Sequence, residues 1–497
     1  MFHKKTLAVK NGKSKRLTVS DFAGGQNSVT DDPYVSFSAA KMSYNVNGDG
    51  GALKESCGAD CFRLPDTSGG EYGVSIQNDT VVRVWYYRRY DVQNECNDDR
   101  IIFLTGNGNL YYIKVNNVSA GTTMFDSRKF TSIPSAVNYR LNGQDVMIFC
   151  SPSDDMRIYD GTGLPQKVFT APKLKTICMH YDRLFAVKEG DKNTLWFSDD
   201  LDPSNWNVGL DEAGYISLTD ERGAIIKLVS FLNYLYVFRD YGISRLTARG
   251  EQTDFFLAHL FVADGKIYGE TVCVCGDRIL FLTDKGLCSF DGAATRRIFT
   301  RLDGFFEGQD NSNAVAEFYR GKYYLSCNVG FDDGQITKAE KNGCVNNALL
   351  QIDLLKGSVD IMRGFDVVSI AALNGDGVSE LLLCFGHNQE FSKTLGKLEK
   401  GGKLFGDNTL KKWVCPSTDL NNGAYPKLLK YVTLKTLYDI VLCVDADGEK
   451  HYFDVSGCQH AQKVPINVVA HEFCVSISAD TEKMYVVRPE FVFKEYD

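Results

Sequence analysis

The stretch Ile279-Leu-Phe-Leu-Thr-Asp-Lys-Gly-Leu-Cys-Ser-Phe-Asp-Gly292 decides the fold expected for this chain. It consists of an apolar run, a polar turn that contains glycine, and a second apolar run, which is the pattern of a β-hairpin. The same pattern recurs at 101–113 and at 234–246, and in a looser form at 146–161. The chain is therefore expected to be built from repeated hairpins.

The spacing of these hairpins indicates how they assemble. One large apolar side chain taken from each unit gives intervals of 46, 36, 53, 43, 43 and 58 residues, for the series Phe103, Phe149, Phe185, Phe238, Phe281, Tyr324 and Leu382. Four-stranded propeller blades repeat at about 40–50 residues. The sequence thus predicts an all-β fold: a β-propeller of about seven blades, with six to eight allowed, and a smaller C-terminal antiparallel β domain.

The domain boundaries follow from changes in composition. Residues 1–70 are rich in glycine and irregular, and are expected to form an arm and a segment that closes the ring. Residues 71–400 are expected to form the propeller. Residues 393–412, rich in Lys and Gly, are expected to be a linker or long loop. Apolar and polar residues alternate again towards the end, which predicts a sandwich-like β domain over 413–497.

Charge is distributed unevenly along the chain. The net charge is −8, and six basic residues without an acid lie among the first twenty, so the rest carries −14; the six are Lys4, Lys5, Lys10, Lys13, Lys15 and Arg16. An acidic body argues against tight binding of nucleic acid, which needs clustered Lys and Arg. The basic arm is either a solvated terminus or a contact with DNA or with an acidic neighbouring subunit.

The fifteen cysteines and seven histidines show no metal-binding spacing. Cys57 with Cys61 and Cys273 with Cys275 are the only close pairs, and neither has a second pair or a histidine beside it. An odd, scattered set of cysteines is typical of reduced thiols in a protein made in the cytosol. The sequence predicts no metal, no membrane span, and no signal peptide.

Two loops resemble calcium-binding loops, and one resembles the turn of sialidase-type propellers. Residues 45–50 and 374–377 place oxygen-bearing side chains before a glycine, but Asn-Gly and Asp-Gly are also common hairpin turns, and turns are the prediction for both. Ser198–Trp206 resembles the Asp-box turn, although Asp202 occupies its glycine position. That turn is structural and lies away from any chemistry.

A cluster of aromatic and basic residues offers the one alternative binding surface. Trp85, Tyr86 and Arg88 could form a platform for sugars, although a half-buried strand with exposed arginines explains them as well. Nucleophile elbows, P-loops and dinucleotide fingerprints are absent, and no spacing singles out a pair of carboxylates. The sequence predicts no catalytic and no cofactor-binding residue, hence no enzyme.

Several sequence segments, taken in order, resemble a family of tailed-phage propeller proteins. These are the tail hub or packaged-DNA stabilisation proteins of short-tailed phages and their prophage relatives. The resemblance spans roughly residues 20–300 and rests on these phrases: Asp21-Phe-Ala-Gly-Gly25, Ser43-Tyr-Asn-Val46, Gly51–Gly58, Leu195–Trp206, Tyr234–Ile243 and Gly269–Gly292. Cys57 departs from the pattern, since many relatives have Arg there.

The resemblance implies a structural virion protein of a bacteriophage tail or neck, made in the host cytoplasm. Such proteins form homo-oligomeric rings, most often six-fold, below the portal and adaptor. They act as a tail hub or nozzle that extends the DNA channel, helps to retain the genome before DNA ejection, and lets DNA pass without sequence specificity. The alternatives are a glycan-binding receptor module and a propeller glycoside hydrolase or lyase.

Overall fold

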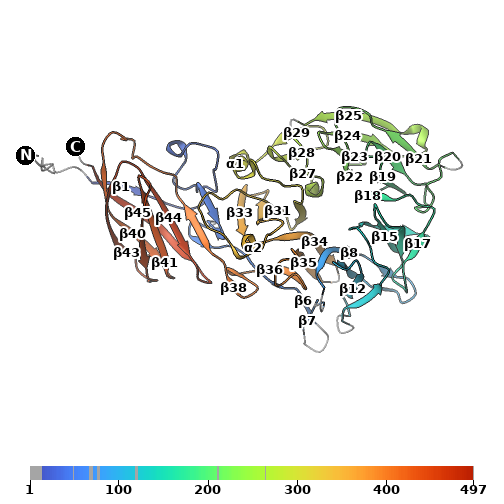
Figure 1. Cartoon of the computed structure of the whole chain (residues 1–497), viewed down its shortest axis with the longest axis horizontal. Coiled ribbons are helices and arrows are strands. Elements are labelled where there is room, and N and C mark those ends of the chain that lie inside the picture. The colour runs from blue at the N-terminus through green and yellow to red at the C-terminus, as the bar shows by residue number, and fades with distance from the viewer. Residues whose placement is uncertain are drawn as a thin grey trace, which may run out of the picture.

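The structure is a computed structural model that describes residues 14–48, 50–65, 71–74, 76, 79–117, 121–209, 212–263, 265–375 and 377–495. It consists of a β-propeller and a β-sandwich. In Figure 1 the blades surround one axis, and the sandwich stands to one side of them. The fold class expected from the hairpin spacing is confirmed, with seven blades.

Each blade is a four-stranded antiparallel sheet, and the blades follow one another in chain order. The first three blades are β8 (Val81–Tyr87), β11 (Arg100–Thr105), β12 (Leu110–Lys114), β13 (Thr123–Asp126); β14 (Ser135–Leu141), β15 (Gln144–Cys150), β16 (Met156–Tyr159), β17 (Gln166–Val168); and β18 (Leu174–His180), β19 (Arg183–Lys188), β20 (Thr194–Phe197), β21 (Gly214–Ser217). The next three are β22 (Ile225–Phe231), β23 (Tyr234–Arg239), β24 (Gly242–Thr247), β25 (Phe256–Val262); β26 (Cys273–Cys275), β27 (Arg278–Thr283), β28 (Gly286–Phe290), β29 (Thr295–Arg297); and β30 (Val315–Tyr319), β31 (Lys322–Cys327), β32 (Ala348–Asp353), β33 (Ser358–Arg363).

The seven side chains that revealed the repeat lie on equivalent strands. All lie on the second strand of their blade, and all are buried. The hairpin at 279–292 is the second and third strand of the fifth blade. The second strand of each blade lies between the sheets of the two neighbouring blades, so its side chains must be apolar on both faces. This is why its run of large apolar residues stands out in the sequence.

The seventh blade is closed by a strand from the N-terminal segment. It comprises β34 (Val367–Gly375), β35 (Val378–Phe385), β36 (Leu395–Glu399) and β5 (Gly58–Cys61), which pairs antiparallel to β36. β37 (Lys403–Leu404) and β38 (Asp407–Asn408) extend this sheet. A Cβ on Gly58 would lie 2.0 Å from the Lys403 carbonyl oxygen, so only glycine lets β37 pass so closely. Joining the first and last parts of a ring in one blade closes it.

The expectation of a linker or long loop over residues 393–412 is wrong. The segment contains β36, β37, β38 and the first residues of β39 (Lys411–Val414). Its many Lys and Gly residues suggested an unstructured stretch, but Leu395 is fully buried in the seventh blade, and Lys411 is also fully buried. The chain therefore passes from propeller to sandwich through paired strands.

The sandwich combines both ends of the chain. One sheet contains β3 (Val46–Asn47), β4 (Leu53–Glu55), β45 (Tyr485–Glu495), β40 (Lys427–Thr436) and β43 (Gln462–Ala470), with β1 (Ser14–Thr18) also on β45. The other contains β2 (Met42–Tyr44), β39, β44 (Phe473–Ala479), β41 (Ile440–Ala446) and β42 (Glu449–Val455). In the core between them, Phe22 packs edge-on against Trp413 with ring centroids 5.1 Å apart. The N-terminal segment, expected to be irregular, thus supplies four strands of this domain.

The remaining elements are short. Two small hairpins, β6–β7 (Arg63–Pro65, Glu71–Gly73) and β9–β10 (Tyr90–Asp91, Cys96–Asn97), stand beside the blades. The described helices are η1 (Asp32–Tyr34), η3 (Gln252–Asp254), η4 (Gly269–Thr271), η5 (Thr300–Leu302), α1 (Asp303–Phe306) and α2 (Lys338–Lys341). None of these is long and apolar enough to cross a membrane.

Candidate functional site

The axis of the propeller holds a cavity of about 610 Å³, to which the first strands of all seven blades contribute. Its lining includes residues of β8, β14, β18, β22, β26, β30 and β34. The circular arrangement of the blades therefore places residues that are far apart in sequence around the same cavity. This axial cavity is the first candidate for a functional site.

A bridge of ion pairs spans the axial cavity. Glu270 in η4 accepts from Arg83 of the first blade at 2.6 Å and from Lys227 of the fourth blade at 3.2 Å. Lys227 and then Arg83 hold the pKa of Glu270 well below its usual range. The three side chains connect blades that are not neighbours, so they tie the ring together across its axis.

A second carboxyl group in the axial cavity behaves differently. Burial raises the pKa of Glu317 above its usual range, and its Oε1 accepts from the backbone N–H of Phe318 at 3.0 Å. Cys273 lies beside it, with its Sγ 4.0 Å from Glu317 Oε1. The contact with Cys275, together with burial, raises the pKa of the Cys273 thiol, so this thiol is protonated and a poor nucleophile. Cys273 thus lies in the wall of the cavity, and Cys275 is buried in the apolar core beside it.

A Ser–His–Asp arrangement occurs on the fourth blade, but its geometry does not suit catalysis. The Ser244 hydroxyl lies 2.9 Å from His259 Nδ1, and His259 Nε2 lies 3.6 Å from Asp220 Oδ2. Ser244 is 0% exposed, so no substrate carbonyl can reach its oxygen. Asp220 is also paired with Arg239 at 2.6 Å. The arrangement therefore stabilises the pairing of β24 and β25.

The side chains of the suggested sugar platform are occupied by contacts within the protein. The Trp85 ring packs edge-on against Phe149 at 5.6 Å, and the Tyr86 hydroxyl donates to Asp99. Arg88 donates to the backbone oxygen of Asn374 at 3.0 Å. Trp85 and Tyr86 belong to β8, where alternate side chains face opposite sides. The three side chains therefore do not form one flat stacking surface.

Arg89 belongs to a cluster that stabilises the first blade. The Asp98 carboxylate accepts from Arg89 at 2.6 Å and from Lys114 at 2.9 Å, and it also pairs with Arg100. Burial acts to raise the pKa of Asp98, but hydrogen bonds from Arg100 and Lys114 hold it below its usual range. The carboxylate is therefore shared by three cations, which tie the strands of the first blade together.

A buried network of charges joins the propeller to the sandwich. Arg363, at the end of β33, pairs with Asp333 at 3.0 Å and with Glu340 at 3.2 Å. Asp333 in turn accepts from the hydroxyl of Tyr44 at 2.8 Å and from Lys412 at 2.9 Å, and both of these belong to the sandwich. Burial acts to raise the pKa of Asp333, but the hydrogen bonds from Lys412 and Tyr44 lower it to about 2. Asp333 is therefore a charged bridge between the two domains.

A buried lysine reinforces this joint. Lys411 Nζ donates to the backbone oxygens of Gly402, Thr409 and Thr481 at 3.2, 2.9 and 2.7 Å. Burial lowers the pKa of Lys411 to about 8. Its three carbonyl partners come from the propeller side, the connection and the sandwich. The ammonium group thus fastens three segments at one point.

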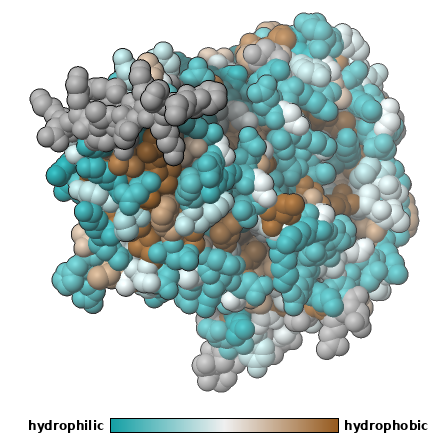
Figure 2. All heavy atoms as spheres, turned by 60° about the vertical axis from the view of Figure 1, so that its left-hand side comes forward, coloured by the Kyte–Doolittle hydropathy of each residue, from teal (hydrophilic) through white to brown (hydrophobic). Residues whose placement is uncertain are grey.

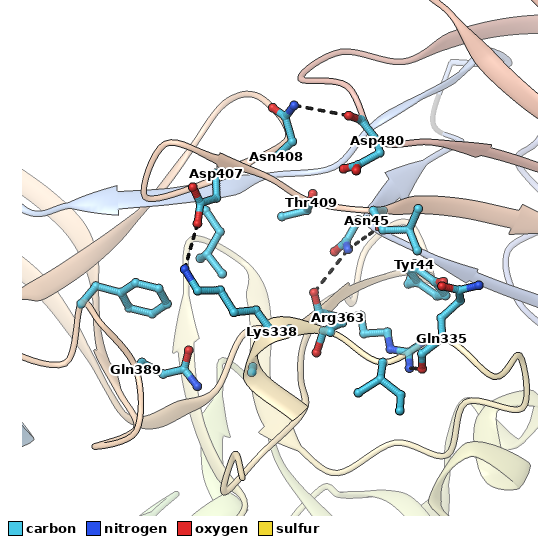
Figure 3. A pocket seen from close by; sticks show the side chains of 17 residues that line it. Tyr44, Asn45, Gln335, Lys338, Arg363, Gln389, Asp407, Asn408, Thr409 and Asp480 are labelled. Carbon is cyan, nitrogen blue, oxygen red and sulfur yellow. Dashed lines mark hydrogen bonds and ion pairs between the residues drawn. The ribbon is translucent and has the colours of Figure 1, made fainter. Parts of the chain in front are cut away.

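The two loops that resembled calcium sites act as structural connections. Asn45 Nδ2 donates to the backbone oxygens of Arg363 and Leu410 (Figure 3), and Asn47 Nδ2 donates to Asp360 Oδ2 at 2.8 Å. β34 ends at Gly375 and β35 begins at Val378, and these two residues pair, so the chain reverses direction here as the turn prediction requires. Asp49 and Asp376 of these loops lie outside the described residues, as do Lys4, Lys5, Lys10 and Lys13 of the basic arm. Among the residues that are described, no three His, Cys, Asp or Glu side chains gather as metal ligands.

The segment that resembled an Asp-box is a structural loop between β20 and β21. Trp206 is buried, and its indole Nε1 donates to the backbone oxygen of Pro203 at 3.0 Å. The Ser198 hydroxyl accepts from the backbone N–H of Leu184 at 3.0 Å. The Trp206 ring packs among apolar residues of the second and third blades. This loop therefore has a structural role between the second and third blades.

Exposed apolar side chains mark several outer strands of the propeller. They are Met124 on β13, Tyr215 on β21, and Phe256 and Val262 on β25. β25 has seven residues, and among the described strands it pairs with β24 alone, so one edge of its backbone is open. On the face shown in Figure 2, hydrophilic side chains predominate and apolar ones gather in separate groups. Apolar residues on an open outer strand are suited to contact with another protein.

Sequence reasoning missed the joint between the domains. Tyr44, Asp333, Arg363 and Lys412 are far apart in sequence and have no common spacing. Asn45 belongs to a stretch that was interpreted as a turn or calcium loop. Only the pairing of β2 with β39, and the packing of both near β33, brings these residues together.

No protein-family model matches the chain, and no curated protein matches its sequence. Among solved structures, the chain is similar to PorZ, an essential bacterial surface component of the type-IX secretion system of Porphyromonas gingivalis. The identity is 11% and the TM-score 0.40, covering 77% of this chain and 46% of that one. It is also similar to the WD40 domain of Neurospora crassa Pan2, with 10% identity and a TM-score of 0.39, over 72% of this chain and 96% of that one. The chain thus spans less than half the length of the PorZ chain it matches.

Proposed function

We propose that this chain is a structural virion protein of a tailed phage. In this proposal it is a tail hub or nozzle-type component that assembles as a homo-oligomeric ring below the portal and adaptor. The ring extends the DNA channel and helps to retain the packaged genome. The observation that carries the proposal is the ordered series of phrases between residues 20 and 300 that resemble the tail hub family.

The rigidity of the chain supports a mechanical role. The axial bridge of Arg83, Glu270 and Lys227 ties blades together across the ring. The network around Asp333 fixes the sandwich to the sixth blade. A part that transmits force and holds a pressurised genome benefits from domains that cannot rotate against each other.

The axial bridge also bears on the path of the DNA. Side chains of the first and fourth blades meet across the propeller axis, so the axis is unsuited as a passage for duplex DNA. The proposal therefore places the DNA channel at the centre of a ring of subunits. The acidic body of the chain, with −14 outside its first twenty residues, is compatible with DNA that slides without binding.

The test is assembly. Light scattering on the purified protein is expected to give a mass near six times 55.4 kDa, and negative-stain microscopy to show rings. Purified portal–adaptor complex from the same phage is expected to bind these rings. A monomer at every concentration would contradict the proposal. Rings that do not bind the portal–adaptor complex would contradict the position proposed for them in the virion.

A further inference from the structure

We propose that an exposed row of apolar turn residues on the third and fourth blades binds the basic arm, residues 1–13, of a second copy of this chain. The row consists of Tyr181, Leu201 and Leu232, which are 40%, 63% and 56% exposed. This proposal rests on the homo-oligomeric assembly proposed above. It names two segments through which neighbouring copies meet.

The three residues of the row lie next to one another on the propeller. Tyr181 lies in the turn between β18 and β19, and its hydroxyl donates to the backbone oxygen of Asn233 at 3.4 Å. Leu232 and Asn233 form the turn between β22 and β23. The backbone N–H of Leu201 donates to the backbone oxygen of Asp182, which follows Tyr181, at 3.1 Å. The row therefore runs from the third blade to the fourth.

The backbone of the row favours residues other than those present. Tyr181, Leu201 and Leu232 have φ angles of 51°, 57° and 46°, in the left-handed region. Gly, Asn and Asp adopt this region most readily, whereas a bulky side chain there is strained. The matching turn of the second blade has Asn142 and Gly143, with φ angles of 49° and 80°. Neither turn geometry nor core packing therefore explains the three exposed apolar side chains, and contact with another protein does.

Unpaired carboxylates surround the row. They belong to Asp182, Asp199, Asp200 and Asp202. Within the described part of the chain, none of these four has an ion-pair partner, and Asp182 and Asp200 are exposed. A surface that combines apolar side chains with unpaired carboxylates is complementary to a basic segment that has apolar side chains of its own.

The basic arm has this composition. Residues 1–13 contain no acid, and they combine four lysines with apolar residues: Lys4, Lys5, Lys10 and Lys13 with Phe2, Leu7 and Val9. The arm directly precedes β1, which begins at Ser14 on the sandwich. The chain therefore carries both the acidic, apolar row and a segment that matches it in charge.

The position of the row assigns it to the arm of another copy. In Figure 1 the third and fourth blades lie on the side of the propeller away from the sandwich, where β1 begins. Thirteen residues reach at most about 45 Å when fully extended. The arm and the row are thus different surfaces at opposite ends of the molecule. A contact between two different surfaces is head-to-tail, and repeated head-to-tail contacts can close into a ring.

Cross-linking between two co-expressed full-length variants tests the contact in the assembled protein. One variant has its four arm lysines changed to Ser, and the other carries Asp182→Asn and Asp200→Asn. A carbodiimide joins Lys to Asp, and neither variant has both partners. Mass spectrometry is therefore expected to find arm lysines joined to Asp182 or Asp200 in the mixed assembly, and in neither variant expressed alone.

A fluorescein-labelled peptide of residues 1–13 measures the row itself by fluorescence anisotropy. The receptor is the full chain with its four arm lysines changed to Ser, so that its own arm does not compete. Leu232→Asn removes an apolar side chain and suits the backbone φ, so it is expected to weaken peptide binding about ten-fold without lowering the stability to urea. Leu355→Asn is the control, because Leu355 is 93% exposed in a turn of the sixth blade, and should leave the affinity unchanged.

Three results would overturn the proposal. In the first, the peptide binds duplex DNA but not the receptor, so that the arm is a contact for DNA. In the second, Leu232→Asn binds the peptide as tightly as the unchanged receptor does. In the third, light scattering shows rings but no cross-link joins the arm to the row, which leaves ring assembly standing and removes this contact. A chain that stays monomeric would contradict the ring assembly as well.

Discussion

At the scale of single residues, His180 makes the stability of the fold depend on pH. His180 is 2% exposed, its Nδ1 lies 2.8 Å from the Ser230 hydroxyl, and burial lowers its pKa from 6.5 to about 4. The unfolded chain therefore binds more protons than the folded chain between pH 6.5 and 4. We expect the free energy of unfolding to fall across this window by up to about 3 kcal/mol from this residue, and to be unaffected by it above pH 6.5.

Urea denaturation of wild type and His180→Gln at pH 7, 5.5 and 4.5 checks this expectation. The free energies of unfolding of the two proteins should converge as the pH falls, because only the wild type has the histidine that titrates. Parallel curves would show that His180 is not the group responsible.

Asp333 is the residue on which the joint depends. Asp333→Asn leaves Arg363 and Lys412 buried without their shared carboxylate, and is expected to lower the free energy of unfolding by about 3 kcal/mol. Asp407→Asn is the matched control, because Asp407 is 72% exposed and its pair with Lys338 should contribute less than about 1 kcal/mol. Chemical denaturation measures both changes. Equal effects would contradict the role of Asp333.

At the scale of elements, β25 is the strand on which ring assembly is predicted to depend. Phe256 is 65% exposed, and a charge there would oppose burial against another subunit. Phe256→Asp is expected to shift the assembly towards monomer in light scattering while circular dichroism stays unchanged. Leu355→Asp, at a 93% exposed position off this strand, should leave the assembly intact. If the mass of the Phe256→Asp assembly is unchanged, β25 is not part of the interface between subunits.

The elements also show how far the sequence could predict this fold. The second strands were predicted well because they are buried on both faces, and their large apolar residues recur in every blade. β1 to β4 were missed because they have only two to five residues, and because β1, β2 and β4 pair with β45 or β39, more than 350 positions away. No local pattern can reveal such pairing. The structural role of Asn45 was hidden for the same reason, since its partners are Arg363 and Leu410.

At the scale of the whole molecule, the N-terminal segment couples the two domains. It contributes β1–β4 to the sandwich and β5 to the seventh blade. Chains with several domains often unfold in more than one step. Here neither domain can lose this segment alone, so we expect one calorimetric transition, with equal calorimetric and van't Hoff enthalpies. Two resolved transitions in differential scanning calorimetry would contradict this coupling.

The closing strand β5 also governs when the protein can fold. A ribosome makes β5 long before β36, and at about 5–20 residues per second the delay is on the order of tens of seconds. Throughout that time the earliest strands have unsatisfied edges, and the first six blades form an incomplete circle. The propeller therefore cannot close until β36 has been made. Chaperones that shield nascent strands should raise its soluble yield more than they raise that of a protein whose domains close one after another.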